Sequence, residues 1–106
     1  MEIEVPEYLE HDEGLVIFNV EASRNDDLMS INDQLISLRF LLTECSSKGL
    51  GLVVLAPKKV ASQVSDRFTD EVGKRIWIHE TESPHELKIV NRRNPGQVYV
   101  WVSTCS

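Results

Sequence analysis

Several features are scarce or missing in this sequence, and their absence narrows the class of protein. No apolar run approaches the ~18 residues that a membrane-spanning helix needs, so no membrane association is expected. With only 4 Pro and 5 Gly, and with 42% hydrophobic and 26% charged residues, the chain is typical of a soluble globular domain. The acidic N-terminus is unlike a basic, apolar secretion signal, so we expect a cytoplasmic protein.

Cysteine is also scarce. The 2 cysteines, Cys45 and Cys105, have the spacing of neither a metal site nor a disulfide framework. We expect Cys45 to be a small buried residue of a helix, and only Cys105 is a candidate for a reactive thiol. A chain of 106 residues can bury one core without such cross-links, so we predict a single domain.

Lysine and arginine are missing from residues 1–13, whose acids account for the whole net charge of −6. We therefore divide the chain into an acidic arm, residues 1–13, and an electrically neutral α/β body, residues 14–106. Net charge of this kind influences encounters with partners more than it influences the fold. Within the arm, Ile3 and Val5 alternate with Glu2 and Glu4, as in a short strand. We expect this segment to pair with a sheet edge of its own or of another subunit.

The body starts with an alternation of buried strands and amphipathic helices. Apolar runs at 15–20 and 50–56 are typical of strands buried on both faces. Between them, apolar residues recur at helical spacing from 28 to 45, after a Ser23-x-x-Asp26 capping pattern and before a stop at Gly49. Apolar residues also recur at helical spacing from Val60 onward, so a second helix is predicted there, and Gly73 is expected to end it. This rhythm predicts a parallel sheet whose third strand spans 75–80.

The last third of the chain changes this rhythm. Segments 86–91 and 97–103 have strand composition, and they flank a sequence, 92–96, whose Asn-Pro-Gly favours a turn. We therefore predict an α/β single domain: a β-α-β-α-β core with a C-terminal antiparallel β-hairpin, with about five strands and two helices.

Aromatic side chains gather on one face of two predicted strands. Trp77 shares a strand face with His79, while Tyr99 and Trp101 share a face of the last strand. If both helices cover the opposite, aliphatic face, then Trp77, Tyr99 and Trp101 form an exposed platform suited to a protein partner. If the helices lie on opposite faces, the three aromatic residues belong to the core.

Charge argues against a nucleic-acid partner for this platform. Binding of nucleic acid needs a basic surface, whereas the chain is acidic and has only Arg92 and Arg93 near the aromatic strands. We expect these two arginines to be the counter-charge for the acidic arm.

Two lysines are candidates for a ligand site. Lys58 and Lys59 open the second predicted helix, directly after a parallel strand, at the sheet edge where α/β proteins commonly bind ligands. Free helix N–H groups and two ammonium groups are suited to a phosphate or carboxylate. No glycine-rich phosphate loop accompanies them, and two solvated lysines are the simpler interpretation.

A histidine and glutamate cluster is a candidate for metal binding. His79, Glu82, His85 and Glu86 lie close together in sequence, and such side chains can bind a divalent metal. Strand neighbours point to opposite faces and Pro84 interrupts the segment, so only some of them can converge. Glu86 also belongs to a Glu-Leu-Lys sequence that matches the E-x-K half of a metal-dependent nuclease motif, without the partner acid.

No serine or cysteine lies in the setting of an activated nucleophile, and we predict no cofactor. The sequence favours a small cytoplasmic binding or regulatory module that acts through protein contact and self-associates as a homodimer. The alternative is a phosphate-ligand binder of nucleotide-like ligands, or a small metal-dependent enzyme, at the carboxyl edge of the sheet.

Overall fold

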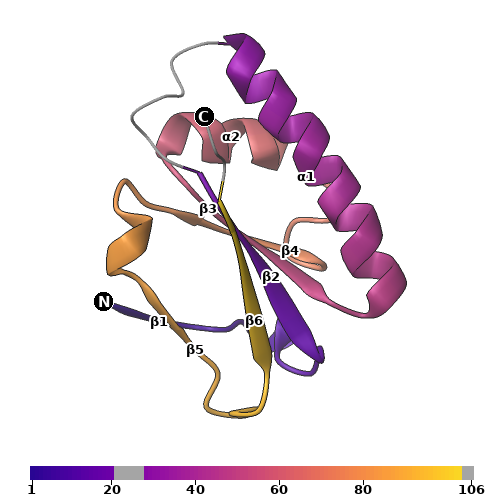
Figure 1. Cartoon of the computed structure of the whole chain (residues 1–106), viewed down its shortest axis with the longest axis vertical. Coiled ribbons are helices and arrows are strands. Elements are labelled where there is room, and N and C mark those ends of the chain that lie inside the picture. The colour runs from indigo at the N-terminus through magenta and orange to yellow at the C-terminus, as the bar shows by residue number, and fades with distance from the viewer. Residues whose placement is uncertain (21–27, 104–106) are drawn as a thin grey trace.

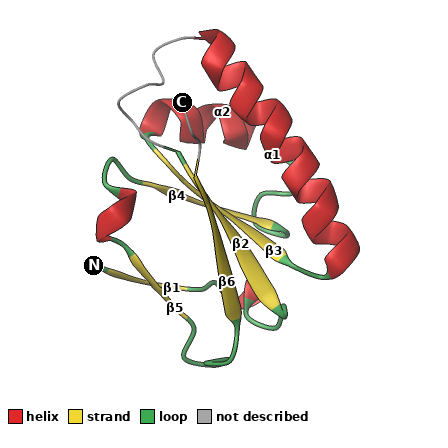
Figure 2. Cartoon of the chain, viewed as in Figure 1, coloured by secondary structure: helices red, strands yellow, loops and turns green. Residues whose placement is uncertain are grey.

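The computed structural model describes residues 1–20 and 28–103, with side chains described for residues 1–20 and 31–102. Helices and strands alternate from residue 14 to residue 80 (Figures 1 and 2), and neither described helix has the length and apolarity needed to cross a membrane. The elements are β1 (Glu2–Glu4), η1 (Glu7–Leu9), β2 (Gly14–Asn19), α1 (Leu28–Lys48), β3 (Gly51–Ala56), α2 (Lys58–Arg67), β4 (Ile76–Glu80), η3 (Pro84–Glu86), β5 (Lys88–Val90) and β6 (Val98–Ser103).

A four-stranded sheet in the order β4-β3-β2-β6 forms the centre of the domain, and all its neighbouring strands are parallel. The helix α1 connects β2 to β3, and α2 connects β3 to β4, which confirms the predicted alternation. Both central strands are buried at every position because layers cover the two faces of the sheet.

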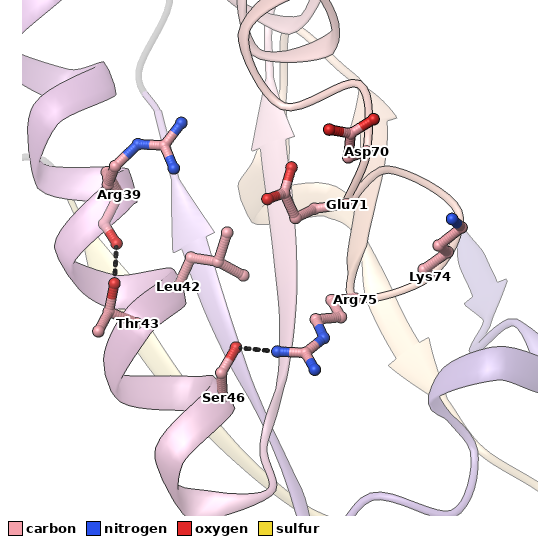
Figure 3. Close-up of a pocket in the computed structure, with 8 residues that line it drawn as sticks. All are labelled: Arg39, Leu42, Thr43, Ser46, Asp70, Glu71, Lys74 and Arg75. Carbon is pink, nitrogen blue, oxygen red and sulfur yellow. Dashed lines mark hydrogen bonds between the residues drawn. The ribbon is translucent and has the colours of Figure 1, made fainter.

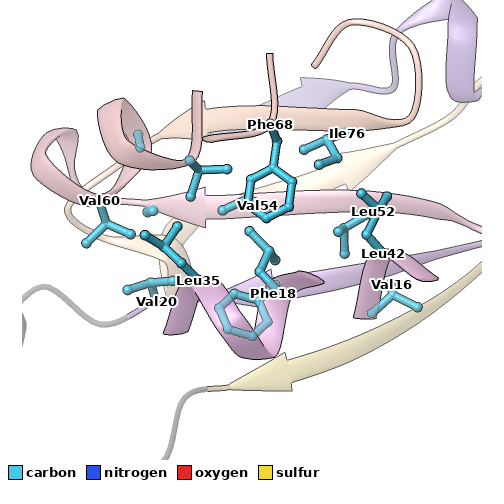
Figure 4. Close-up of a cluster of buried hydrophobic side chains, with 14 of the residues drawn as sticks. Val16, Phe18, Val20, Leu35, Leu42, Leu52, Val54, Val60, Phe68 and Ile76 are labelled. Carbon is cyan, nitrogen blue, oxygen red and sulfur yellow. The ribbon is translucent and has the colours of Figure 1, made fainter. Parts of the chain in front are cut away.

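Both helices lie on the same face of this sheet (Figure 1) and form the first hydrophobic core with it. Phe18 of β2, Leu35 of α1 and Phe68 just after α2 point into this core (Figure 4). The predicted stop at Gly49 is confirmed, since its φ is 70° and the N–H of Leu50 donates to the Cys45 carbonyl at 2.9 Å.

Cys45 belongs to this first core, as predicted, and its side chain is buried. Burial raises the pKa of the Cys45 thiol, and the neighbouring Glu44 carboxylate raises it further. Both effects disfavour the thiolate, so Cys45 is a structural residue rather than a nucleophile. Cys105 lies outside the described residues, as does the Ser23-x-x-Asp26 capping pattern.

The second core lies on the opposite face of the sheet, and the acidic arm supplies three of its nine buried residues. The arm strand β1 pairs in parallel with β5 in a separate two-stranded sheet, where Ile3 lies opposite Ile89. Ile3, Val5 and Leu9 are buried, and they pack on the face of the sheet that the helices leave free. The other buried members of this cluster are Leu15, Ile17, Val53, Leu55, Leu87 and Ile89.

The predicted C-terminal antiparallel hairpin is not confirmed. Strand β5 pairs with β1, whereas β6 pairs in parallel with β2 over six residues from Val98 to Ser103. The turn itself exists, because the Gln97 N–H donates to the Asn94 carbonyl at 3.1 Å. This turn leads the chain from the second layer into the main sheet. A turn motif indicates where a chain reverses and leaves open which strand it will meet.

The predicted end of the second helix is wrong. The helix α2 stops at Arg67, and Val72 instead forms an isolated parallel bridge with Ile76. Phe68 leaves the helical conformation and is buried in the first core. Gly73, with φ at 86°, serves the loop that follows, so its left-handed conformation marks a turn rather than the end of the helix.

Candidate functional site

The aromatic face follows neither of the two predicted alternatives. Both helices cover the aliphatic face, yet Trp77 and Tyr99 are half-buried because the arm and β5 pack against them as part of the second core. Burial raises the pKa of the Tyr99 phenol, with a smaller contribution from the Glu4 carboxylate. Only Trp101 keeps a large exposed fraction, 47% of its surface. The exposed platform is thus reduced to one end of β6.

Strand β6 is the edge of the main sheet, and it exposes apolar side chains on both of its faces. Val98 is 61% exposed and Val100 is 51% exposed on the helix side, while Trp101 is exposed on the other side. The strand Val-Tyr-Val-Trp-Val-Ser contains no charge, glycine or proline. Long uncharged edges of this kind are ready to pair with another strand.

The opposite edge of the same sheet, strand β4, is protected against pairing with another strand, unlike β6. Strand β4 carries His79 and Glu80 near its end. At its start, the loop after α2 contacts it through the bridge between Val72 and Ile76, and the Gly73 N–H donates to the Ile76 carbonyl at 3.1 Å. Charges and covering loops are usual devices against edge pairing. The β6 edge has neither device among the described residues.

The arm is engaged within its own chain, and its predicted counter-charge is confirmed. Arg92 pairs with Glu2 at 3.0 Å and with Glu4 at 2.6 Å. Arg93 pairs with the buried carboxylate of Glu10 at 2.8 Å, and this hydrogen bond raises the pKa of the Arg93 guanidinium. Ile3 and Val5 are therefore intramolecular core contacts in this structure, not an exposed docking segment.

Buried polar side chains fix the turn that introduces β6. The Gln97 amide donates to the carbonyls of Leu9 and Asp12 at 2.9 and 3.0 Å. The Asn91 amide donates to the Gln97 side-chain oxygen at 2.8 Å and to the Glu10 carbonyl at 3.2 Å. Nothing in the sequence indicates this network, because Asn and Gln near an Asn-Pro-Gly turn are ordinary loop residues. The backbone carbonyls that they bind lie more than 80 positions away.

Lys58 and Lys59 occupy the predicted place, at the start of α2 directly after β3, and both are exposed. Strand β2 ends at the same edge with Asn19, which is 3% exposed and whose Oδ1 has no hydrogen-bond partner. Binding of a phosphate by the two lysines stays a prediction.

The candidate metal residues are spread over two elements. His79 is on β4, while His85 and Glu86 belong to η3 and, like Glu82, are exposed. Among the described residues, no group of three or more histidine, cysteine, aspartate or glutamate side chains is arranged to hold a metal ion.

A groove that the sequence analysis did not identify lies between the two helices. It has a volume of about 400 Å³, and its wall includes Ile36 and Phe40 of α1 together with Phe68. Ile36 is 57% exposed and Phe40 is 70% exposed. The signal was present in the sequence, since these residues extend the apolar stripe of α1 beyond the single face that a sheet can bury.

A second, more polar pocket of about 410 Å³ adjoins this groove and shares Arg39 with it. Arg39 and Ser46 of α1 face Glu71 and Arg75 of the loop before β4 across this pocket (Figure 3). The Arg75 guanidinium donates to the Ser46 hydroxyl at 2.6 Å. Charges of both signs line the pocket, because Asp70 and Lys74 also belong to it (Figure 3).

Comparison of the chain with protein-family models, with curated proteins and with solved structures finds no match. The β6 edge and the groove between the helices are thus the two surfaces from which function is inferred.

Proposed function

We propose that this protein is a small self-associating module that acts through protein contact, and that β6 is the strand through which two copies pair. The observation that carries the proposal is the uncharged edge of β6, with Val98, Val100 and Trp101 exposed. Pairing of two β6 strands satisfies the free N–H and C=O groups of that edge and buries its apolar side chains.

The sequence of β6 is self-complementary, as a two-fold symmetric interface requires. In an antiparallel pair centred on Val100, that residue lies opposite its own copy and Tyr99 lies opposite Trp101 of the second copy. Val98 then lies opposite Val102. Aliphatic side chains meet on the helix face and aromatic side chains on the other face. Cross-strand pairs of these types contribute roughly 0.2–1 kcal/mol each.

The test is sedimentation velocity on the full chain and on Val100→Lys. We expect a dimer for the native sequence and a monomer for the variant, because two ammonium groups would lie directly opposite each other at the centre of the interface. Phe40→Lys is the matched control, since it places the same charge at another exposed apolar residue and should leave the dimer intact. A native chain that remains monomeric at millimolar concentration, or a dimeric Val100→Lys, contradicts the proposal.

Disulfide cross-linking tests the register of the same dimer. With Cys105→Ser as background, Val100→Cys should form a covalent dimer under oxidation, because the Cα atoms of directly opposite residues are about 4.5–5.5 Å apart, within the Cα separations found in disulfides. Val98→Cys should not, since four residues along a strand separate the two copies of that position by roughly 13 Å. Equal cross-linking at both positions would show that the register is wrong.

A further inference from the structure

We propose that the groove between α1 and α2 binds an acidic amphipathic segment of a partner protein. The segment would place apolar side chains in the groove and carboxylates beside the arginines at its rim. This inference goes beyond self-association, because the groove shares no residue with β6. It assigns the protein a second surface with a different kind of partner.

The groove has the apolar character that a helix-in-groove contact needs. Leu35 and Phe68 are buried beneath it, and Ile36 and Phe40 stand exposed along it. Ile36 and Phe40 are four positions apart on α1, so they lie on the same side of the helix, one turn apart. An amphipathic helix with apolar residues at the same spacing can cover both, as in known helix-in-groove recognition.

Charge at the groove selects the kind of segment. Among the residues whose side chains the structure describes, the two charged ones that line the groove are Arg39 and Arg67, in a protein whose net charge is −6. The Arg39 guanidinium lies 4.7 Å from the centre of the Phe68 ring, and Arg67 donates to the Asn32 side-chain oxygen at 3.4 Å. Among the described residues, both guanidinium groups are thus positioned by neutral groups, and both remain exposed. Guanidinium groups bind carboxylates in charge-assisted, bidentate hydrogen bonds.

The polar pocket beside the groove limits how far an acidic segment can extend. Beyond Arg39, the carboxylates of Asp70 and Glu71 line the wall together with Lys74 and Arg75 (Figure 3). An acidic ligand would meet like charge there. The favourable stretch is therefore the one between Arg39 and Arg67, along Ile36 and Phe40.

A second copy of this chain is a poor source of the acidic segment. The most acidic part of the sequence is the arm, and its Glu2, Glu4 and Glu10 already pair with Arg92 and Arg93. Its apolar residues are equally occupied in the second core. The proposed ligand is therefore a segment of a different protein.

The test is selection of a random peptide library displayed on phage against the full chain, followed by fluorescence anisotropy with the selected peptides. We expect enriched peptides with apolar residues at helical spacing and with Asp or Glu beside them. Phe40→Ala and Arg67→Gln should each weaken binding about tenfold, equivalent to ~1.4 kcal/mol. Both residues are exposed, so the variants should keep the unfolding midpoint of the native protein.

Val100→Lys is the control that separates this inference from the proposed dimer, because it alters β6 and should leave peptide affinity unchanged. Replacing the acids of a selected peptide by Gln should weaken binding as much as Arg67→Gln does. Absence of any enriched peptide, enrichment of neutral or basic sequences, or affinities insensitive to both groove variants would overturn the inference. So would a monomeric Phe40→Ala, which would identify the groove as a contact between copies.

Discussion

Removal of residues 1–13 is expected to abolish cooperative folding of the domain. The deletion takes away Ile3, Val5 and Leu9, all buried in the second core, and exposes the face of the sheet on which they pack. Burial of such a side chain contributes about 1.5–3 kcal/mol. The three together are comparable with the ~5–15 kcal/mol that stabilises an ordinary domain. Urea unfolding followed by the fluorescence of Trp77 and Trp101 measures the effect.

Two point variants separate the contribution of a buried arm residue from that of an exposed one. Leu9→Ala removes one buried side chain of the arm and should lower the free energy of unfolding by about 2–5 kcal/mol. Glu7→Ala, at an exposed position of the same segment, should change it by no more than about 0.5 kcal/mol. A deletion variant that unfolds cooperatively at the native urea midpoint would contradict the role of the arm in the core. The same reasoning makes Val100→Lys a better test of dimer formation than removal of the arm.

Local sequence patterns were sufficient to predict the central architecture. Strands β2 and β3 are buried on both faces, and α1 buries an apolar stripe. Each kind of burial leaves its own pattern in the sequence, so the period and composition of the segment identify it. Gly49 was found for the same reason, since a helix stop is a local event. The parallel direction of β2, β3 and β4 followed from the helices between them.

The partners of the C-terminal strands could not be predicted from local patterns. Whether β5 pairs with β6 or with β1 depends on which surface needs covering, and the aliphatic face was already covered by both helices. The remaining face needed apolar side chains, which the arm supplies through Ile3 and Val5. The alternation of apolar and acidic residues predicted that this segment pairs with a sheet edge, but it identified neither β5 as the partner nor the main sheet as the surface that Ile3 and Val5 cover.

The same limit applies to the candidate surfaces. The aromatic pattern correctly placed Tyr99 and Trp101 on one face of β6. It did not show that β6 lies at the sheet edge, because strand order is a property of the whole fold. The groove between the helices depends on the angle and spacing of α1 and α2. For Ile36 and Phe40, the sequence offered only an apolar excess with no assigned role.

The buried amide of Gln97 should contribute strongly to the stability of the fold, and Gln97→Glu is the variant that tests this contribution. The native amide donates to the carbonyls of Leu9 and Asp12 and accepts from Asn91. The substitution keeps the size and the acceptor but replaces the two donated hydrogen bonds by a carboxylate facing two carbonyl oxygens. An uncompensated buried charge costs about 3–5 kcal/mol, so we expect a loss of this size in the free energy of unfolding at neutral pH.

The loss should depend on pH in a defined direction. Burial near carbonyl oxygens raises the folded-state pKa of the introduced carboxyl above its unfolded value of about 4.3, because both effects disfavour the charged form. Relative to the native protein, the variant should therefore be least destabilised below that unfolded value, where its O–H can donate to one carbonyl. The destabilisation should grow as pH rises towards the folded-state pKa and then level off.

Urea unfolding of Gln97→Glu and of the native chain between acidic and neutral pH measures this difference. Gln63→Glu, at a partly exposed position of α2, introduces the same charge elsewhere and should change the free energy of unfolding by no more than about 0.5 kcal/mol. A loss that is the same at all pH values would contradict a buried carboxylate that faces two carbonyl oxygens, and an equal loss for Gln63→Glu would contradict the specific role of the Gln97 amide. That turn positions β6 at the edge of the sheet. Gln97→Glu should therefore also weaken the dimer formed through Val100, while Gln63→Glu should not.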